Sequence, residues 1–259
     1  MDQWVNFNSI YKCIALRLIN NPDFTIHNRK GERTFEMIDY SFRLIEPKNC
    51  FATIRNLSLK YLEGEIAFYL SGSPFLKDIT KYSKFWGGVT DDGRVINSNY
   101  GKLLLHDRNF HGYTQFEYAR DMLIQNLDSK KAVMTIYSNE NSFPSNDNPC
   151  TMYLQFFIRN GEIHLYVNMR SSDIWFGLPY DVPFFILILY KMQKELIKYG
   201  LKNIRIGTYN HRAGSLHLYE RNKGIVLKCI ENSVGTDYSS YEEGSVQLDM
   251  FERFVLNNL

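Results

Sequence analysis

Two neighbouring runs of aromatic and β-branched residues set the tightest limit on how this chain can fold. They cover residues 150–159 and 162–169, and the dipeptide Asn160-Gly161 joins them. Asn-Gly is the pair that best tolerates the positive φ angles of a two-residue hairpin turn. The pattern therefore predicts an antiparallel β-hairpin, and any fold proposed for the chain must contain it.

Two segments have the apolar spacing of helices that pack on a sheet. Residues 57–70 place their apolar side chains on one helical face and stop before Gly72, a residue that suits a helix end. Residues 114–127 repeat this pattern, and Thr114 with Glu117 has the spacing of a capping box. Both segments are predicted to be helices.

Three further segments complete the expected fold. Residues 182–199 are apolar almost all round at first, then gain lysines and end at Gly200, which predicts a helix through the core. Residues 34–44 and 215–220 alternate as half-buried strands do. The chain is expected to be α+β, with helices packed on a large mixed sheet. No repeat or linker divides it, so residues 1–259 are expected to form a single domain.

Charge and hydropathy exclude several classes of partner. The chain has 30 Lys and Arg against 28 Asp and Glu, and no basic run that would follow a nucleic-acid backbone. Its longest apolar stretch, 182–190, is far shorter than the ~20 residues that span a bilayer. The N-terminus lacks the basic-then-apolar order of a signal peptide. We therefore expect a cytoplasmic protein that binds neither a nucleic-acid polymer nor a membrane.

The cysteines and histidines show no metal-binding pattern. Cys13, Cys50, Cys150 and Cys229 stand alone, without CxxC spacing. This spacing suggests neither a disulfide framework nor a zinc site, which indicates a reducing compartment. The histidines also lack the spacing of metal ligands, so no metal is expected.

Five short motifs in the second half of the chain carry the most information about function. In order they are NDNPC at 146–150, LQFFI at 154–158, MRSSD at 169–173, FGLPYD at 176–181 and GSLHLYERN at 214–222. Together they resemble the thymidylate synthase family, whose core reads Pro-Cys, QF, RSxD, G-x-P-[FY]-N and HxY. Each motif alone is weak, but five in this order and spacing are specific.

The resemblance extends upstream over nearly the whole chain. The family's earlier motifs are matched by NRKGERTFEMIDYSFR at 28–43, EIAFYLSG at 65–72, FW at 85–86 and INSNYG at 96–101. The resemblance implies the family fold, with sheets packed back to back in a homodimer. It also implies a pyrimidine nucleoside monophosphate as substrate and 5,10-methylenetetrahydrofolate as the one-carbon donor.

The departures from the family pattern point to one branch of it. Asp181 stands where thymidylate synthases carry Asn. Two smaller changes are Thr151 in place of His after the Pro-Cys pair, and Met169 in place of Gln before Arg-Ser. These changes resemble the cytidylate hydroxymethylase branch, known from phages and from pyrimidine-antibiotic pathways, which ends its reaction with water. For a phage-encoded member, the expected location is the host cytoplasm.

Hydrogen-bond chemistry supports this branch independently. Uracil presents an N3–H donor and an O4 acceptor, which the amide of an Asn matches. Cytosine presents an amino donor at C4 and, once N3 is protonated, two adjacent donors that an ionised Asp accepts. Asp181 is therefore predicted to select cytosine and to stabilise the N3-protonated ring, which makes C6 more electrophilic.

Cys150 is the predicted nucleophile. C5 of a pyrimidine is a poor nucleophile until a thiolate adds at C6 and turns the C5–C6 bond into an enamine. A lone cysteine is more often a core residue, but Pro149 and the motifs that follow favour catalysis here. Cys13, Cys50 and Cys229 are expected to be structural.

The resemblance assigns the substrate phosphate to a set of mostly cationic residues. Arg29, Arg170 and Ser171 resemble the family's phosphate-binding residues, and arginine grips phosphate with forked donors. Lys130 and Lys131 stand where the family has an Arg-Arg pair that reaches the partner's phosphate site in the dimer. Lysine binds phosphate as a point charge rather than as a fork. Taken alone, lysines at this position are more often a solvated helix end.

Four further residues match parts of the family that contact the base and the sugar. Glu65 resembles the acid that orders water and relays protons at the pyrimidine. Tyr100 fits either that network or the core. His217 and Tyr219 match the pair that binds the sugar 3′-hydroxyl, and on an alternating strand they project to one face.

The folate site is predicted from four residues, and the whole pattern predicts an enzyme. Trp86, Asp173, Gly177 and Tyr180 resemble an aromatic wall, a carboxylate for the pterin and a close-approach glycine. The predicted activity is 5-hydroxymethylation of dCMP or CMP, and which sugar is used stays open. The alternatives are thymidylate synthesis from dUMP and a non-catalytic relative that binds nucleotide or RNA. The C-terminal FERFVLNNL, unlike the small apolar tail of the synthases, argues against the first alternative.

Overall fold

The computed structural model describes residues 2–28, 31–233, 235 and 241–259. They fall into two compact units, which we call unit 1 and unit 2. Unit 1 comprises residues 1–57, 168–191 and 206–259, and unit 2 comprises residues 58–167 and 192–205. Three elements contribute residues to both units, namely β6 (Glu162–Asp173), α5 (Leu178–Lys198) and β7 (Arg205–Tyr219). The units are described in turn.

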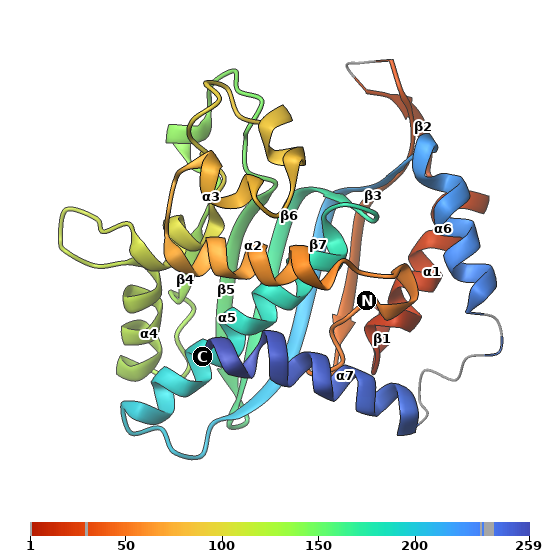
Figure 1. Ribbon diagram of the computed structural model, residues 1–259. Helices are drawn as coiled ribbons and strands as arrows, with labels where there is room; N and C mark the ends of the chain where they lie inside the picture. The colour runs from red at the N-terminus through yellow and green to blue at the C-terminus, as the bar shows by residue number, and fades with distance from the viewer. Residues whose placement is uncertain (1, 29–30, 234, 236–240) are drawn as a thin grey trace. The chain divides into compact units, whose positions relative to one another are not determined.

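Unit 1 is built around the central strand β3. This strand pairs in parallel with β1 and antiparallel with β2 and β7, and β6 follows β7 in the strand order. The helices α1 and α6 lie side by side in this unit (Figure 1). Its other elements are β1 (Asp2–Trp4), α1 (Phe7–Asn20), β2 (Phe24–His27), β3 (Arg33–Leu44), η1 (Thr53–Arg55), α6 (Glu220–Asn232), α7 (Tyr241–Phe254) and η5 (Leu256–Asn258).

Unit 2 continues the strand order from β6 to β5 and β4. The helix α4 packs beside β4 at this end (Figure 1). Its other elements are α2 (Leu59–Ser71), α3 (Leu76–Thr80), η2 (Lys84–Gly88), η3 (Lys102–His106), α4 (Gln115–Gln125), β4 (Val133–Thr135), η4 (Asn139–Asn141) and β5 (Thr151–Arg159). Parallel and antiparallel pairs occur in one sheet with helices packed on it, so the predicted α+β class with a mixed sheet is confirmed.

The locally encoded elements agree with the sequence. Asn160 has φ 52° and Gly161 has φ 74°, which are the two positive angles of the predicted hairpin turn between β5 and β6. Helix α2 ends at Gly72, whose φ is 66°. Helix α4 begins after Thr114, which forms the predicted reciprocal capping box with Glu117.

Two elements begin several residues before their patterns indicated. Helix α5 begins at Leu178 rather than at 182. Its first turn tolerates Pro179, because the first N–H groups of a helix have no partner within it and the missing N–H of proline costs no hydrogen bond there. Strand β7 begins at Arg205 rather than at 215. Its first half buries the alternate positions 207, 209, 211 and 213, but Gly, Tyr, His and Ala occupy them, so the sequence shows no apolar alternation there.

No helix in the described part of the chain is both long and apolar enough to cross a membrane. The longest, α5, is instead a core helix of unit 1 in its first half, where the run 184–189 is almost completely buried. A helix that is apolar all round is stable in water only when neighbouring elements cover every face. This matches the prediction of a helix through the core.

One buried glutamine attaches the C-terminal helix to unit 1. Gln247 on α7 is fully buried, and its side-chain amide pairs with both backbone groups of Phe51. It accepts from Phe51 N at 3.0 Å and donates to Phe51 O at 2.8 Å. A second bond set joins the same elements, since Glu243 accepts from Asn8 at 2.7 Å and from Thr53 at 3.1 Å. These bonds hold the segment that leads into η1.

We predict that Gln247→Ala lowers the free energy of unfolding by about 3 kcal/mol, because it leaves the buried N–H and C=O of Phe51 unpaired. Urea unfolding followed by circular dichroism measures the change. Gln125→Ala, at an exposed position of α4, is the matched control and stays within about 0.5 kcal/mol of the parent. Equal losses for the two variants would contradict the assignment.

Candidate active site

The predicted site residues divide between the two units. Unit 1 holds Arg170, Ser171, Asp173, Gly177, Tyr180, Asp181, His217 and Tyr219. Unit 2 holds Glu65, Trp86, Tyr100, Lys130, Lys131 and Cys150. The predicted phosphate ligand Arg29 lies outside the described residues. The two groups are therefore built up separately.

In unit 1, two carboxylates flank the turn between β6 and α5, namely Asp173 and Asp181. Asp181 lies in the first turn of α5, and its backbone N–H donates to the Gly177 carbonyl at 3.0 Å. A Cβ at Gly177 would lie 3.2 Å from an Asp181 carboxylate oxygen, so this glycine leaves room for the acid. Burial, and secondly the nearby Asp173, raise the pKa of Asp181 to about 7. Asp181 thus exchanges its proton near neutral pH.

Asp173 has a second task that the sequence did not reveal. It ends β6 and accepts hydrogen bonds from Trp175 N at 2.6 Å and Phe176 N at 3.2 Å, which fixes the turn into α5. Burial raises the pKa of Asp173, while the His217 imidazole and these backbone donors oppose that rise. Its carboxylate therefore shapes the loop that carries Gly177, whichever ligand it also contacts.

His217 and Tyr219 lie on one face of β7, as the alternation predicted. Their rings are 5.1 Å apart and nearly perpendicular. The side chain of Ser215 lies 3.5 Å from His217 Nδ1 and donates a short hydrogen bond to Glu36 on β3. Neither Ser215 nor Glu36 was predicted from the sequence. The available signal was an acid, Glu36, between apolar residues in an alternating strand.

Arg55 is a buried cation that the sequence analysis also missed. Its guanidinium lies 4.2 Å from the centre of the Trp175 ring and 5.1 Å from that of Tyr180. It donates to the Trp175 carbonyl at 2.7 Å and to the Tyr180 hydroxyl at 3.1 Å. A cation between two aromatic faces is stabilised by their π electrons. Arg55 therefore fixes Tyr180, a predicted folate residue.

A cavity of about 480 Å³ opens beside this stack within unit 1. Its lining includes Arg55 and Trp175, together with Lys228, Cys229 and Asn232 of α6. Burial raises the pKa of the Cys229 thiol, although Arg55 opposes the rise. The cavity therefore combines one aromatic wall with two cations, and the thiol in it is not activated.

In unit 2, a set of tyrosines connects three predicted residues. Glu65 on α2 is buried and accepts from Tyr61 Oη at 2.6 Å and from Tyr69 Oη at 3.5 Å. Tyr61 in turn accepts from Trp86 Nε1 at 3.1 Å. Tyr69 stacks on Tyr100, with 5.4 Å between ring centres and 13° between planes. Tyr100 is itself buried and packs beside a tyrosine that donates to Glu65, so its role in this network stays a prediction.

The two bridging tyrosines lie four residues before and after Glu65, and that spacing puts all three on one face of α2. The sequence therefore held this signal.

The close packing of Tyr69 against Tyr100 explains the glycine that follows Tyr100, because a Cβ at Gly101 would lie 1.9 Å from the Tyr69 carbonyl oxygen. A residue with a side chain at 101 would push the stacked pair apart.

Cys150 is placed directly before β5 and is partly exposed. Thr151 after it is fully buried, and the N–H groups of Ile136 and Tyr137 donate to the Met152 carbonyl at 2.8 and 3.1 Å. The chain on its C-terminal side is thus fixed. Cys50, by contrast, is fully buried, and burial raises the pKa of its thiol.

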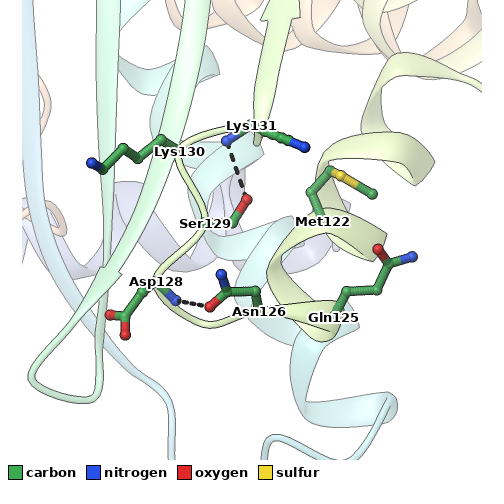
Figure 2. Close-up of a pocket in the computed structure, with 7 residues that line it drawn as sticks. All are labelled: Met122, Gln125, Asn126, Asp128, Ser129, Lys130 and Lys131. Atoms are coloured by element: carbon green, nitrogen blue, oxygen red, sulfur yellow. Dashed lines mark hydrogen bonds between the residues drawn. The ribbon is translucent and has the colours of Figure 1, made fainter.

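The two lysines predicted to reach a partner follow the C-terminal end of α4 in unit 2. Figure 2 shows them beside a cavity of about 350 Å³, with their side chains pointing to opposite sides of the segment. Both are exposed. The turn before them is fixed by hydrogen bonds from Lys131 N to Ser129 Oγ at 3.1 Å and from Asp128 N to Asn126 Oδ1 at 2.9 Å. The backbone just before Lys130 and Lys131 is therefore held by hydrogen bonds.

Across the described ranges, no group of three His, Cys, Asp or Glu side chains is arranged to hold a metal ion. Two carboxylates of the site accept hydrogen bonds from the protein. Asp173 accepts two backbone N–H groups, and Glu65 accepts two phenols. Donors of this kind fix an acid in one orientation.

Comparison with known proteins shows which family the chain resembles. The family model described as thymidylate synthase matches residues 10–239. The deoxycytidylate 5-hydroxymethyltransferase of Enterobacteria phage T4 is 31% identical over 215 residues, which cover 80% of this chain and 84% of the phage protein. The phage T6 protein of the same name has the same identity and coverage.

A deoxyuridylate hydroxymethyltransferase of Bacillus phage SP01 is 27% identical over 251 residues, which cover 92% of this chain and 64% of that protein. The match of the family model extends over most of the chain, and the resemblance inferred from the motifs is thereby confirmed. This chain belongs to the thymidylate synthase family.

Proposed function

We propose that this chain is a 5-hydroxymethyltransferase that converts dCMP or CMP to its 5-hydroxymethyl derivative. The observation that carries the proposal is the environment of Asp181, a carboxylate whose pKa burial and Asp173 raise to about 7. Relatives named for deoxycytidylate 5-hydroxymethylation support it. We propose that residues 1–259 act as one catalytic domain.

The proton on Asp181 explains the choice of base. A protonated carboxyl donates to cytosine N3 and accepts from the C4 amino group, whereas an ionised carboxylate accepts both hydrogen bonds from a ring protonated at N3. The two descriptions differ only in where one proton lies. Uracil offers N3–H and O4 instead. An ionised carboxylate has no donor for O4, so only the protonated acid gives the pair of bonds that an Asn amide gives. Cytosine is therefore matched whichever partner holds the proton, whereas uracil is matched only when Asp181 keeps it.

Cys150 is the proposed nucleophile. Its thiolate adds to C6, and C5 then attacks the one-carbon unit as an enamine carbon. C5 loses its proton and the bond between the one-carbon unit and its donor breaks. Once water has added to the exocyclic carbon, the thiolate leaves C6. Glu65, held by Tyr61 and Tyr69, is proposed to place the water that completes the reaction. The phenol donors keep this carboxylate in one orientation, which is the requirement for a group that directs a small molecule such as water.

The donor of the one-carbon unit is proposed to be 5,10-methylenetetrahydrofolate, which supplies a methylene at the oxidation level of formaldehyde. The residues of unit 1 suit such a group, because Arg55, Trp175 and Lys228 give the cavity described above an aromatic wall and two cations. A flat ring with a carboxylate tail matches that lining. Asp173, Gly177 and Tyr180, and Trp86 of unit 2, are the other proposed folate contacts.

The rest of the nucleotide is proposed to be bound by polar side chains. Arg170 and Ser171, at the end of β6, together with Arg29, would hold the phosphate, and His217 with Tyr219 would bind the 3′-hydroxyl. We propose a homodimer with sheets back to back, in which Lys130 and Lys131 of one protomer reach the phosphate site of the other.

A uracil nucleotide is the second candidate substrate, since one relative is named as a deoxyuridylate hydroxymethyltransferase. Incubation with methylenetetrahydrofolate and each of dCMP, CMP and dUMP separates the candidates through product mass and dihydrofolate release. The expected product is a cytidine nucleotide heavier by one hydroxymethyl group, without dihydrofolate. A methylated product from dUMP with dihydrofolate would refute the proposal.

The nucleophile is tested by Cys150→Ser. Turnover is expected to fall at least about 1,000-fold, because the hydroxyl is a much poorer nucleophile than the thiolate, while nucleotide affinity stays unchanged. Steady-state rates and calorimetric binding of dCMP measure the two quantities. Cys13→Ser, on α1 and outside the cavity lining, is the control and keeps full turnover. An active Cys150→Ser enzyme would remove Cys150 from the reaction.

The base-selecting role of Asp181 predicts both specificity and pH dependence. Asp181→Asn is expected to lower kcat/KM for dCMP about 100-fold and to raise it for dUMP. For the parent enzyme, kcat/KM for dCMP should fall as the pH rises through about 7, because the free enzyme then loses the proton that the complex needs. Asp181→Asn should lose this inflection. Unchanged selectivity would show that another residue reads the base.

Sharing of sites between protomers predicts complementation. Cys150→Ser and the double variant Lys130→Ala/Lys131→Ala should each be nearly inactive, and a reassociated mixture should regain activity, because one site of the heterodimer has every residue intact. Single-lysine variants then show whether both diverging side chains contribute. If the mixture stays as inactive as its parents, the lysines do not act across a dimer.

A further inference from the structure

The loop that ends in Cys150 is tied to a distant segment of unit 2 by a buried carboxylate. Asp147 is 5% exposed. It accepts the backbone N–H of Asn97 at 2.5 Å and that of Ser98 at 3.3 Å, and the Ser98 hydroxyl donates a further short bond to its other oxygen. A carboxylate is costly to bury, and three donors offset that cost here.

A second carboxylate makes the tie reciprocal. Asp91, next to the first segment, accepts the hydroxyl of Ser145 at 2.5 Å and the N–H of Asn146 at 2.8 Å. Ser145 Oγ also accepts from Asp147 N at 2.9 Å. The segment 91–98 therefore contributes Asp91, which accepts from the backbone of the 145–148 loop, and that loop contributes Asp147, which accepts from the backbone of the segment. The Ser145 hydroxyl links the two acids, because it donates to Asp91 and accepts from Asp147 N. The position of Asp147 is fixed from both directions.

The tie acts close to the nucleophile. Only Asn148 and Pro149 separate Asp147 from Cys150. The proline ring fixes φ at 149 and restricts the backbone of residue 148, so this short connection has little freedom. On the other side of the cysteine, β5 begins at once with the buried Thr151. The position of Asp147 is therefore passed on to Cys150.

The other end of the tie leads to the tyrosine network. Asn97 and Ser98 come just before Tyr100, which stacks on Tyr69. Tyr69 is one of the two phenols on Glu65. One set of hydrogen bonds thus sets the spacing between the chain at Cys150 and the chain at Tyr100. Both belong to unit 2, so the relation lies within a single compact body.

We propose that Asp147, held by Asp91, is a positioning residue that sets the placement of Cys150 relative to Tyr100 and Glu65. The inference rests on the proposed function, because it gives a task to the proposed nucleophile. Asp147 acts through the backbone and does not touch the substrate. A displacement of about 1 Å at a reacting group is enough to lower a rate about 100-fold.

The test uses four variants of the full chain. Asp147→Ala is expected to lower kcat about tenfold or more, with the KM for dCMP changed less than about twofold, because nucleotide contacts remain. Asp147→Asn should restore most of kcat, since its amide oxygen can accept both N–H groups while its NH₂ donates to Ser98 Oγ. Asp91→Ala should also lower kcat, and it removes an exposed side chain that the fold tolerates.

Asp92→Ala is the matched control. Asp92 accepts the N–H groups of Arg94 at 2.8 Å and Val95 at 2.9 Å, so it caps the same segment without any bond to the 145–148 loop. Its loss should leave kcat unchanged. If Asp92→Ala lowers kcat as far as Asp147→Ala, or if both Asp147→Ala and Asp91→Ala keep kcat within about twofold, the positioning role is refuted.

Two readouts separate this inference from the proposed function. Hydrogen exchange should show faster exchange at Asn97 and Ser98 in Asp147→Ala, but not in Asp92→Ala. The rate of Cys150 alkylation by iodoacetamide, resolved by peptide mass spectrometry, should change more than about threefold in Asp147→Ala alone. Neither measurement needs turnover. If Cys150→Ser stays active while hydrogen exchange and alkylation change as expected, the proposed function is wrong but the positioning role of Asp147 is supported. If neither exchange nor alkylation changes in Asp147→Ala, the positioning role is refuted.

Discussion

The burial of acidic side chains is the constraint on which the rest of this structure depends. A carboxylate taken out of water must either gain hydrogen-bond donors or keep its proton. Asp173, Asp147 and Glu65 have donors from turn N–H groups, a distant segment and two phenols respectively, although burial still raises the pKa of Asp173 and that of Asp147. Asp181 takes the second course, and its pKa of about 7 is the result.

These two solutions have different consequences for chemistry. A fully hydrogen-bonded acid is fixed in place and organises the chain around it, as Asp173 does for the turn into α5 and Asp147 does for the loop before Cys150. An acid that keeps its proton can exchange it with a ligand. The base-reading residue is of the second kind, and the residues around it are of the first.

The parts of the fold that could be predicted from sequence are those specified by neighbours along the chain. The hairpin turn needed only Asn160-Gly161, and the start of α4 needed only Thr114 and Glu117. The full length of β7 could not be predicted, because the buried positions of its first half include Gly207, His211 and Ala213, which give the sequence no apolar alternation.

The candidate site divides in the same way. Motif resemblance identified Glu65 and Asp173 but gave no information about their partners. Tyr61 and Tyr69 were accessible from helical spacing, whereas Arg55 reaches Trp175 across 120 positions and Asp147 reaches Asn97 across 50. Contacts of that kind leave no local period, because only the folded chain brings their two ends together.

The acid at position 181 also couples recognition to folding. Its pKa is raised from an ordinary value near 3.8 to about 7, so the folded chain binds this proton more tightly than the unfolded chain. The contribution of Asp181 to stability is therefore most favourable below about pH 4 and declines as the pH rises to about 7. An Asn at this position would make no pH-dependent contribution to stability. A carboxylate that pairs with cytosine through a shared proton must sit where ionisation is unfavourable, beside Asp173 and away from water, and the same surroundings that tune it for the base reduce the stability of the fold.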